Sequence, residues 1–448
     1  MLKKYISEIK KTFTLAVPVI IGQLGHVLLG ITDSAMVGRV GSDQLAASSL
    51  VNGIFFLLLV LGIGISIAVT PLVAMAKGGN NHEECGILLR QSLLVNIFFS
   101  IIFTGLVFIA SYFLEYLNQP EEVVLLAGSY MRIIGFSIIP FMLFQTYRQF
   151  IEGLSFTKPA MYIAIISNVV NVFGNWILIY GKLGMPALGL DGAGYASLIT
   201  RLFMAIALFS FVVTNKHFKE YDPTLRFKNI NWPIIRKLIN LGVPSGFTAF
   251  FEVFAFSFSS IMMGWISSNA LAAHQIGISF ASISFMIILG ISAASTIRVG
   301  TAMGKKDFDS LKPIGFSSIM FSSILMSSFG IIFIAFRNYL PWLFVVDTEV
   351  IEIAASLLVI AAFFQISDGV QAVGLGLLRG ITDVKIPMIA TFIAYWVISL
   401  PVGYIIAFKY EMGAIGIWIG LLLGLTLVAI FFTLRFNYKI EVIKNEHS

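Results

Sequence analysis

Two carboxylic acids stand inside long apolar stretches of the chain. Glu252 lies in the segment 248–256, and Asp368 lies in the segment 363–369. An ionisable group in hydrocarbon costs roughly 3 kcal/mol, so each acid needs a partner or a task. Counting about 1.5 Å of rise per residue places both acids at comparable depth in their helices. Two carboxylates that face one space of low dielectric keep a proton or share a cation. The pair therefore predicts a switchable cation site that could hold Na⁺ as its metal. The alternative is that each acid is hydrogen-bonded to backbone or to a hydroxyl such as that of Ser367, and only braces the helices.

A third acid and two amides form a second candidate set. Asp33 interrupts the first apolar stretch, and Asn171 and Asn175 stand four residues apart in another. Residues spaced by four share one face of a helix, so the two amides can act together. A carboxylate with two amide oxygens is the kind of ligand set that a hard cation or hydronium prefers. The alternative is that the asparagines tie helices together by hydrogen bonds, as is common in membranes.

The other ionisable groups in apolar stretches call for simpler explanations. Several lie nearer the predicted helix ends, where snorkelling or loop ion pairs explain them: Arg132, Arg148, Glu152, Arg201 and Arg379. His26 and His274 are expected to be packed polar residues rather than parts of a proton relay.

The composition predicts that these residues are positioned by membrane helices. Hydrophobic residues make up 58% of the chain and charged residues only 12%, and the mean hydropathy is +0.92. Soluble domains have roughly 25% charged residues. The single cysteine excludes an internal disulfide and a cysteine metal site, and the five scattered histidines exclude an HExxH site. We find no metal-ligand cluster and no Ser/His/Asp set, and therefore expect neither an enzyme nor a cofactor.

Windows of about 20 or more apolar residues predict an all-α, polytopic membrane protein with twelve helices. The predicted spans are 14–38, 45–76, 88–115, 123–150, 160–182, 190–215, 238–265, 272–303, 312–345, 350–378, 386–408 and 412–436. The polar stretch 216–237 separates helices six and seven, so we expect an N-terminal bundle (1–215), a basic linker (216–237) and a C-terminal bundle (238–448).

The two halves repeat one another at an offset of about 226 residues. Between Pro18 and Gly78, about 17 of 61 positions are identical to their partners between Pro244 and Gly304. We interpret Pro18 and Pro244 as start signals of the first helix in each half. With six helices per half the repeats are parallel, related by an axis along the membrane normal, and a cleft is expected between them. Such duplication is typical of transporters, in which one copy rocks against the other.

The distribution of Lys and Arg predicts the orientation. The termini and the loops on their side hold about 23 of the 29 basic residues, by our assignment. The opposite loops hold about four: Arg39, Lys182, Arg337 and Lys409. Both termini should therefore be cytoplasmic, and the net charge of +6 reflects membrane topology rather than nucleic-acid binding.

The chain resembles the multidrug and toxic compound extrusion (MATE) family, and within it the NorM-like branch. The resemblance rests on TDSAMVG at 32–38, NVFGN at 171–175, IYGKLGMPA at 179–187, FE at 251–252, QISD at 365–368 and LRG at 378–380. It implies twelve helices in two six-helix bundles, and electrogenic or proton-driven export of organic cations. Family cation-site positions fall on Glu252 and Asp368 in the C-terminal half, and on Asp33, Asn171 and Asn175 in the N-terminal half. Members of the NorM-like branch often have a tyrosine where this chain has Phe364, so one oxygen ligand of the family site is missing unless water or Ser367 replaces it.

These observations predict a cation-coupled (Na⁺ or H⁺) multidrug efflux antiporter of the cell inner membrane, expected to be a monomer. One rival is a flippase for lipid-linked saccharides of the same superfamily, which should have a cationic cavity where this chain has mostly acids. A channel is a second rival, although channels usually need symmetry around a pore and a selectivity ring.

Overall fold

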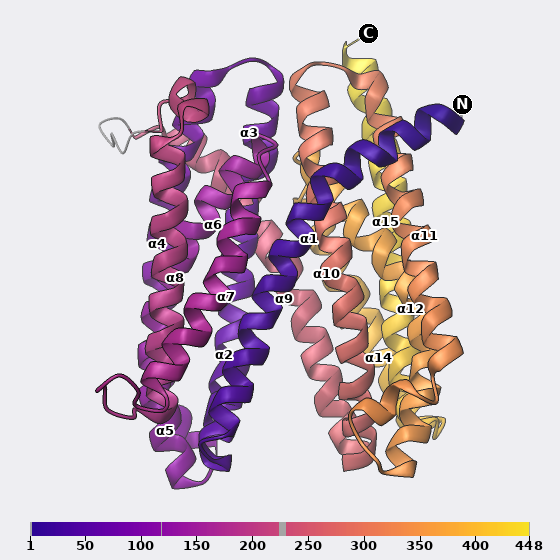
Figure 1. Ribbon diagram of the computed structural model, residues 1–448. Helices are drawn as coiled ribbons and strands as arrows, with labels where there is room; N and C mark the ends of the chain where they lie inside the picture. The colour runs from indigo at the N-terminus through magenta and orange to yellow at the C-terminus, as the bar shows by residue number, and fades with distance from the viewer. Residues whose placement is uncertain (1, 118, 224–229, 448) are drawn as a thin grey trace. The chain divides into compact units, whose positions relative to one another are not determined.

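The computed structural model describes residues 2–117, 119–223 and 230–447, and over these residues the chain is helical without strands. Twelve spans in the described part are long and apolar enough to cross a membrane, which confirms the predicted fold class and number of spans. The first six are α1 (Leu2–Gly38), α2 (Ser42–Ile67) with α3 (Val69–Gly78), α4 (His82–Ser111), α5 (Glu121–Phe136) with α6 (Ile138–Gly153), α7 (Lys158–Leu178) and α8 (Gly189–Thr214) (Figure 1). The second six are α9 (Trp232–Ile266), α10 (Ser268–Gly304), α11 (Leu311–Phe336), α12 (Thr348–Gly380), the run α13 (Lys385–Phe392), η5 (Ile393–Ser399), α14 (Leu400–Tyr404) and η6 (Ile405–Lys409), and α15 (Gly413–His447).

Prolines explain where two spans are interrupted. The junction between α2 and α3 at Ala68 and the junction between α5 and α6 at Ser137 each precede a proline by three residues, Pro71 and Pro140. A proline lacks the N–H that would bond to the carbonyl four residues earlier, so the helix breaks there. Pro18 and Pro244 behave differently from our expectation, because they lie inside α1 and α9 rather than at their starts.

Several helix ends also differ from the prediction. α1 begins at Leu2 instead of residue 14, and α15 runs to His447 instead of residue 436. A hydropathy window detects only the apolar part of a helix that lies in the bilayer. The polar turns at the start of α1 and at the end of α15 extend beyond that part. Of the expected linker 216–237, the first residues form the short helix η2 (Lys216–Tyr221) and the last belong to α9, whereas residues 224–229 lie outside the described part.

The chain forms two compact units whose boundaries fall within helices. One unit is Ile21–Gly246, and the other comprises the residues up to Ile20 together with those from Phe247 onward. Ile20 and Gly246 correspond to one another in the sequence repeat. Each unit therefore contains the first part of a helix whose remainder belongs to the other unit.

In the unit Ile21–Gly246, the first part of α9 packs on α2 through two glycines. A Cβ on Gly64 would lie 2.2 Å from the Cα of Gly246, so the two backbones touch at this point. Small residues allow membrane helices to approach this closely. The helix α6 is buried along nearly its whole length and forms the centre of this unit.

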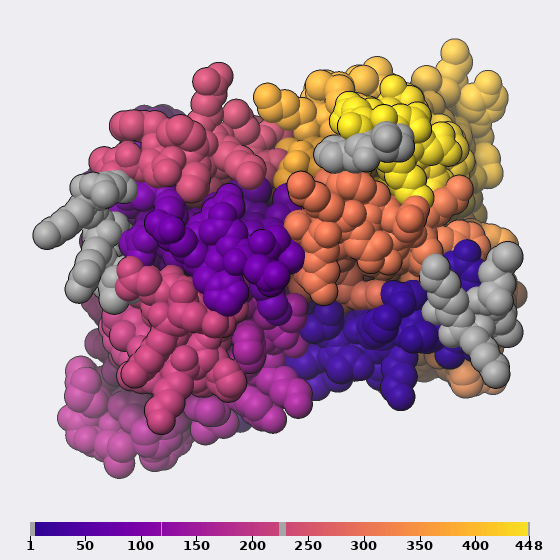
Figure 2. Space-filling view, turned by 90° about the horizontal axis from the view of Figure 1, so that it is seen from above, coloured from indigo at the N-terminus to yellow at the C-terminus, as the bar shows by residue number. Residues whose placement is uncertain are grey.

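In the other unit, the first part of α1 packs on α10 at the repeat-equivalent position. A Cβ on Gly290 would lie 2.3 Å from Cγ1 of Ile20. Further along α10, Arg298 pairs with Glu8 and donates to the Thr12 hydroxyl at 2.6 Å. Figure 2 shows the start of α1, in indigo, along the orange surface of the same unit.

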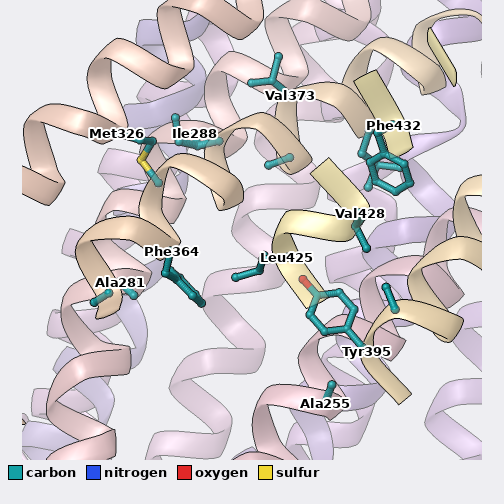
Figure 3. Packing of buried hydrophobic residues seen from close by; sticks show 14 of the residues in the cluster. Ala255, Ala281, Ile288, Met326, Phe364, Val373, Tyr395, Leu425, Val428 and Phe432 are labelled. Atoms are coloured by element: carbon teal, nitrogen blue, oxygen red, sulfur yellow. The ribbon is translucent and has the colours of Figure 1, made fainter. Parts of the chain in front are cut away.

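The core of this unit is built around α12, which packs on α10, α11 and α15. Figure 3 shows how its buried side chains interdigitate, including Ile288 of α10, Met326 of α11, Val373 of α12 and Phe432 of α15. Dense packing of this kind gives α12 a fixed frame from which Asp368 projects.

Candidate functional site

Asp33 and the two asparagines come together within the unit Ile21–Gly246, as predicted. The Asn175 side chain donates from Nδ2 to Oδ1 of Asp33 at 2.6 Å and to Oδ1 of Asn171 at 3.3 Å. Both asparagines are buried, at 1% exposure or less. The Oδ1 atom of Asn175 is buried and has no hydrogen-bond partner among the described residues. An unsatisfied buried oxygen beside a carboxylate leaves an acceptor available to a cation.

Ser197 of α8 completes this group and was missed from the sequence. Its hydroxyl donates to Oδ2 of Asp33 at 2.9 Å, so both oxygens of the carboxylate accept a hydrogen bond. The sequence signal was weak, because a serine four residues before an arginine in an apolar helix is usually a packing residue.

Arg201 lies one turn beyond Ser197, midway along α8, and the expectation that it stands near a helix end was wrong. Its guanidinium donates to the Ser137 hydroxyl at 2.7 Å and lies 5.0 Å and 5.2 Å from the ring centroids of Phe55 and Phe141. Cation–π contacts of this kind stabilise a charge away from water. The charge of Arg201 also interacts with that of Asp33.

Three of the other charges singled out from the sequence have local partners. Arg148 and Glu152 form an ion pair at 2.7 Å, as expected. The pair lies inside the bundle rather than in a loop, because its side chains are only 5% and 3% exposed. Arg132 donates to the backbone oxygen of Gly128 at 3.0 Å. Arg379 lies in the last turn of α12 and is buried rather than snorkelling.

The two histidines pack as polar side chains, as predicted. His274 accepts a hydrogen bond at Nδ1 from Trp418 at 3.0 Å, which leaves Nε2 to donate to the Ser260 hydroxyl, also at 3.0 Å. His26 lies between the rings of Phe141 and Phe144.

Glu252 of α9 and Asp368 of α12 come together in the other unit. Asp368 is 4% exposed and Glu252 is partly exposed, and the two carboxyl groups are close enough for their charges to interact. Ser367, considered as a brace for the acids, instead shares a hydrogen bond of 2.9 Å with Thr426 of α15.

Two neutral residues beside these acids were also missed. Gln371, one turn after Asp368, lies close enough to Glu252 to interact with its carboxyl group. The Tyr395 hydroxyl donates to Oε1 of Gln371 at 2.8 Å, and both side chains are buried. The spacing of Asp368 and Gln371 along one helix face was a usable signal, whereas nothing near Tyr395 in the sequence connects it to the acids.

The two groups differ in their donor atoms from a transition-metal site. Among the described residues no three His, Cys, Asp or Glu side chains are grouped to hold a metal ion. Each unit instead offers one or two carboxylates surrounded by amide and hydroxyl groups, which is the ligand chemistry of hard cations and protons.

Known proteins share both the repeat and the fold. The MatE family model matches residues 18–177 and again 244–405. A probable multidrug resistance protein NorM of Agrobacterium fabrum is 36% identical over 440 residues, covering 96% of this chain and 94% of the relative. The multidrug resistance protein NorM of Vibrio vulnificus is 32% identical over 446 residues, covering 97% and 96%.

Solved structures agree in fold at lower identity. The eukaryotic MATE transporter AtDTX14 superposes with a TM-score of 0.88 at 20% identity, covering 99% of each chain. An outward-facing multidrug resistance MATE family transporter of the MOP superfamily gives 0.90 at 20% identity, covering 98% of this chain and 97% of that one. With both halves matched and relatives along nearly the whole length, this chain belongs to the MATE family, in its NorM-like branch.

Proposed function

We propose that this chain is a cation-coupled multidrug antiporter, which exports organic cations while Na⁺ or H⁺ moves the opposite way. The relatives named as multidrug resistance proteins support the export of drugs. One observation carries the coupling: no ion pair within 4.0 Å involves Asp33, Glu252 or Asp368 among the described residues. Arg201 and Arg379 interact with Asp33 and Glu252 only from beyond that distance. Without a counter-ion in contact, these carboxylates can bind a mobile cation.

Each group of residues has its own role in this proposal. Glu252 and Asp368 bind the coupling ion and attract the cationic drug, and Asp33 with Asn171 and Asn175 forms a second ion or proton site. Coupling requires only that ion and drug favour different conformations, or compete for the same negative charge. The protein needs no cofactor for this and works as a monomer.

Alternating access supplies the movement. The two repeats are parallel and related by an axis along the membrane normal, and alternating access rocks one bundle against the other. The excess of Lys and Arg on the side of the termini supports a cytoplasmic position for both termini of this cell inner membrane protein. The cation then enters from outside as the drug leaves.

A flippase for anionic saccharide lipids fits the residues less well. Such a substrate needs unpaired positive charge at mid-membrane depth, and Arg201 is the best candidate for it. Arg201, however, lies against two phenylalanine rings and near the charge of Asp33. Family membership also makes the chain a transporter rather than an enzyme.

The test is efflux of ethidium from cells that express the full chain, comparing wild type with Asp368→Asn. The variant should lose driven efflux while the protein remains folded and inserted, because an amide cannot replace a negative charge. Glu352→Gln is the matched control, since Glu352 is an exposed acid on the same helix. Efflux at the wild-type rate by Asp368→Asn would refute the assignment of this acid.

A further inference from the structure

Tyr395 is a fully buried tyrosine in η5, one of two π-helical turns in the eleventh span. π-Helical turns are rare and are found frequently at functional sites, because the extra residue turns a side chain out of the helical register. The proposed function does not use this residue, although it lies beside the acids that the function requires.

The hydroxyl proton of Tyr395 has a fixed direction. It is donated to Oε1 of Gln371 at 2.8 Å. With Oε1 as acceptor, the amide of Gln371 keeps its Nε2 available to Glu252, whose carboxyl group interacts with this side chain. A phenol has one donor and two lone pairs, so the lone pairs of Tyr395 remain free for another partner.

The Tyr395 hydroxyl, which carries these lone pairs, interacts electrostatically with both acids. The hydroxyl of Tyr395 is close enough to Glu252 and Asp368 for such an interaction with each. Helix α9 brings Glu252, the run α13 to η6 brings Tyr395, and α12 brings Asp368. Three spans therefore bring these oxygen-bearing groups within electrostatic range of one another.

The rings of Tyr395 and Phe364 pack against one common aromatic residue. Phe364 is one turn before Asp368 and packs against Phe256, which is one turn after Glu252, with ring centroids 5.8 Å apart. The ring of Tyr395 packs against the same Phe256 at 6.1 Å. In Figure 3 the oxygen of Tyr395 is turned toward the side of the view on which Phe364 lies.

The next residue in the π turn fixes this geometry. Trp396 donates from Nε1 to the backbone oxygen of Phe251 at 3.1 Å, directly before Glu252 in α9. Two consecutive side chains of η5 thus bond to different helices. Tyr395 bonds to Gln371 of α12, and Trp396 bonds to the backbone of Phe251 in α9. The segment sets the spacing of the two acid-bearing helices as well as the position of the hydroxyl.

We propose that Tyr395 is a third oxygen ligand for Na⁺ at the Glu252–Asp368 site, with its hydroxyl proton held on Gln371 so that its lone pairs face the cation. Tyr395 supplies the neutral oxygen that Phe364 lacks. This rests on the proposed function, because it assumes that the two acids bind the coupling ion. Na⁺ prefers a site that mixes charged and neutral oxygen ligands, whereas a proton needs only one carboxylate.

The test measures Na⁺ binding directly. The purified full chain is melted at increasing NaCl, with choline chloride holding ionic strength constant, and the half-saturating Na⁺ concentration is read from the rise in melting temperature. Tyr395→Phe should raise this concentration at least tenfold. Adding Phe364→Tyr to that variant should return it to within about threefold of wild type, because the hydroxyl is restored from the neighbouring helix. Tyr404→Phe, on an exposed tyrosine of the same span, should change nothing.

Three outcomes would overturn the proposal. They are an unchanged Na⁺ response in Tyr395→Phe, a double variant that loses the response as fully as the single one, and a wild-type chain whose melting temperature does not respond to Na⁺. Efflux driven by a pH gradient in proteoliposomes separates this failure from that of the proposed function. Suppose that wild type fails the Na⁺ test but still exports ethidium under a pH gradient, whereas Asp368→Asn does not. That result would support the proposed antiporter function and refute only the assignment of Tyr395 as a Na⁺ ligand.

Discussion

The buried ion pair of α6 allows a quantitative prediction about stability. Arg148 donates from Nε to Oε1 of Glu152, one turn later, and both side chains are almost completely buried. Glu152→Gln keeps the shape and one acceptor but removes the charge, which leaves the guanidinium buried without a counter-ion. Removal of one partner from such a pair costs about 3–5 kcal/mol. For a unit of this size each kcal/mol lowers the melting temperature by about 2–4 °C, so we expect a fall of about 6–20 °C.

The matched control is the double variant Arg148→Met/Glu152→Leu. Replacing both members of a buried pair by apolar residues of similar volume is often neutral or stabilising, so this variant should melt close to wild type or above it. The assay is size-exclusion chromatography of detergent-solubilised protein after heating. A single variant within about 2 °C of wild type, or a double variant as unstable as the single one, would refute the argument that the charge pairing matters.

Three further predictions concern the packing of each unit. Gly64→Val should destabilise the protein by about 1–3 kcal/mol through overpacking, because the added Cβ would meet the Gly246 backbone. The control Gly53→Val, on the same helix, should melt like wild type because a Cβ there meets nothing within 4 Å. Arg298→Gln should speed amide hydrogen exchange in residues 5–12 by about tenfold or more, because the loss of a charge-assisted bond to Glu8 weakens the docking of α1 by about 1.5–3 kcal/mol; unchanged exchange would contradict this. Cys85 is 0% exposed, so it should resist maleimide in the native protein and react after denaturation, and labelling of the native protein would show that α4 is packed differently.

The sequence was sufficient for the features that depend on local composition. Runs of apolar residues predict each span because the bilayer demands them, and the four-residue spacing of Asn171 and Asn175 predicts their shared face. The positions of Asp33, Glu252 and Asp368 followed from the expense of burying a charge.

Features that depend on contacts between distant segments could not be predicted from the sequence. Arg201 packs in mid-helix against Phe55 and Phe141, which come from two other helices, so its own neighbours in sequence do not reveal what stabilises its charge. Ser197 and Tyr395 carry neutral hydroxyls, which cost little to bury and therefore give no signal. The division of α1 at Ile20 falls inside continuous apolar sequence and is visible only from what each part packs against.

The most direct test of the central claim is to measure the flux of the coupling ion itself. Proteoliposomes containing the full chain are loaded with an ethidium gradient, with no initial gradient of Na⁺ or pH, and the movement of ²²Na⁺ and of protons is followed separately. The antiporter predicts that ethidium moving down its gradient drives one of these cations the other way and so builds up a gradient of that cation, and that Asp368→Asn abolishes this exchange. If ethidium moves while neither cation does, coupling through these carboxylates is contradicted.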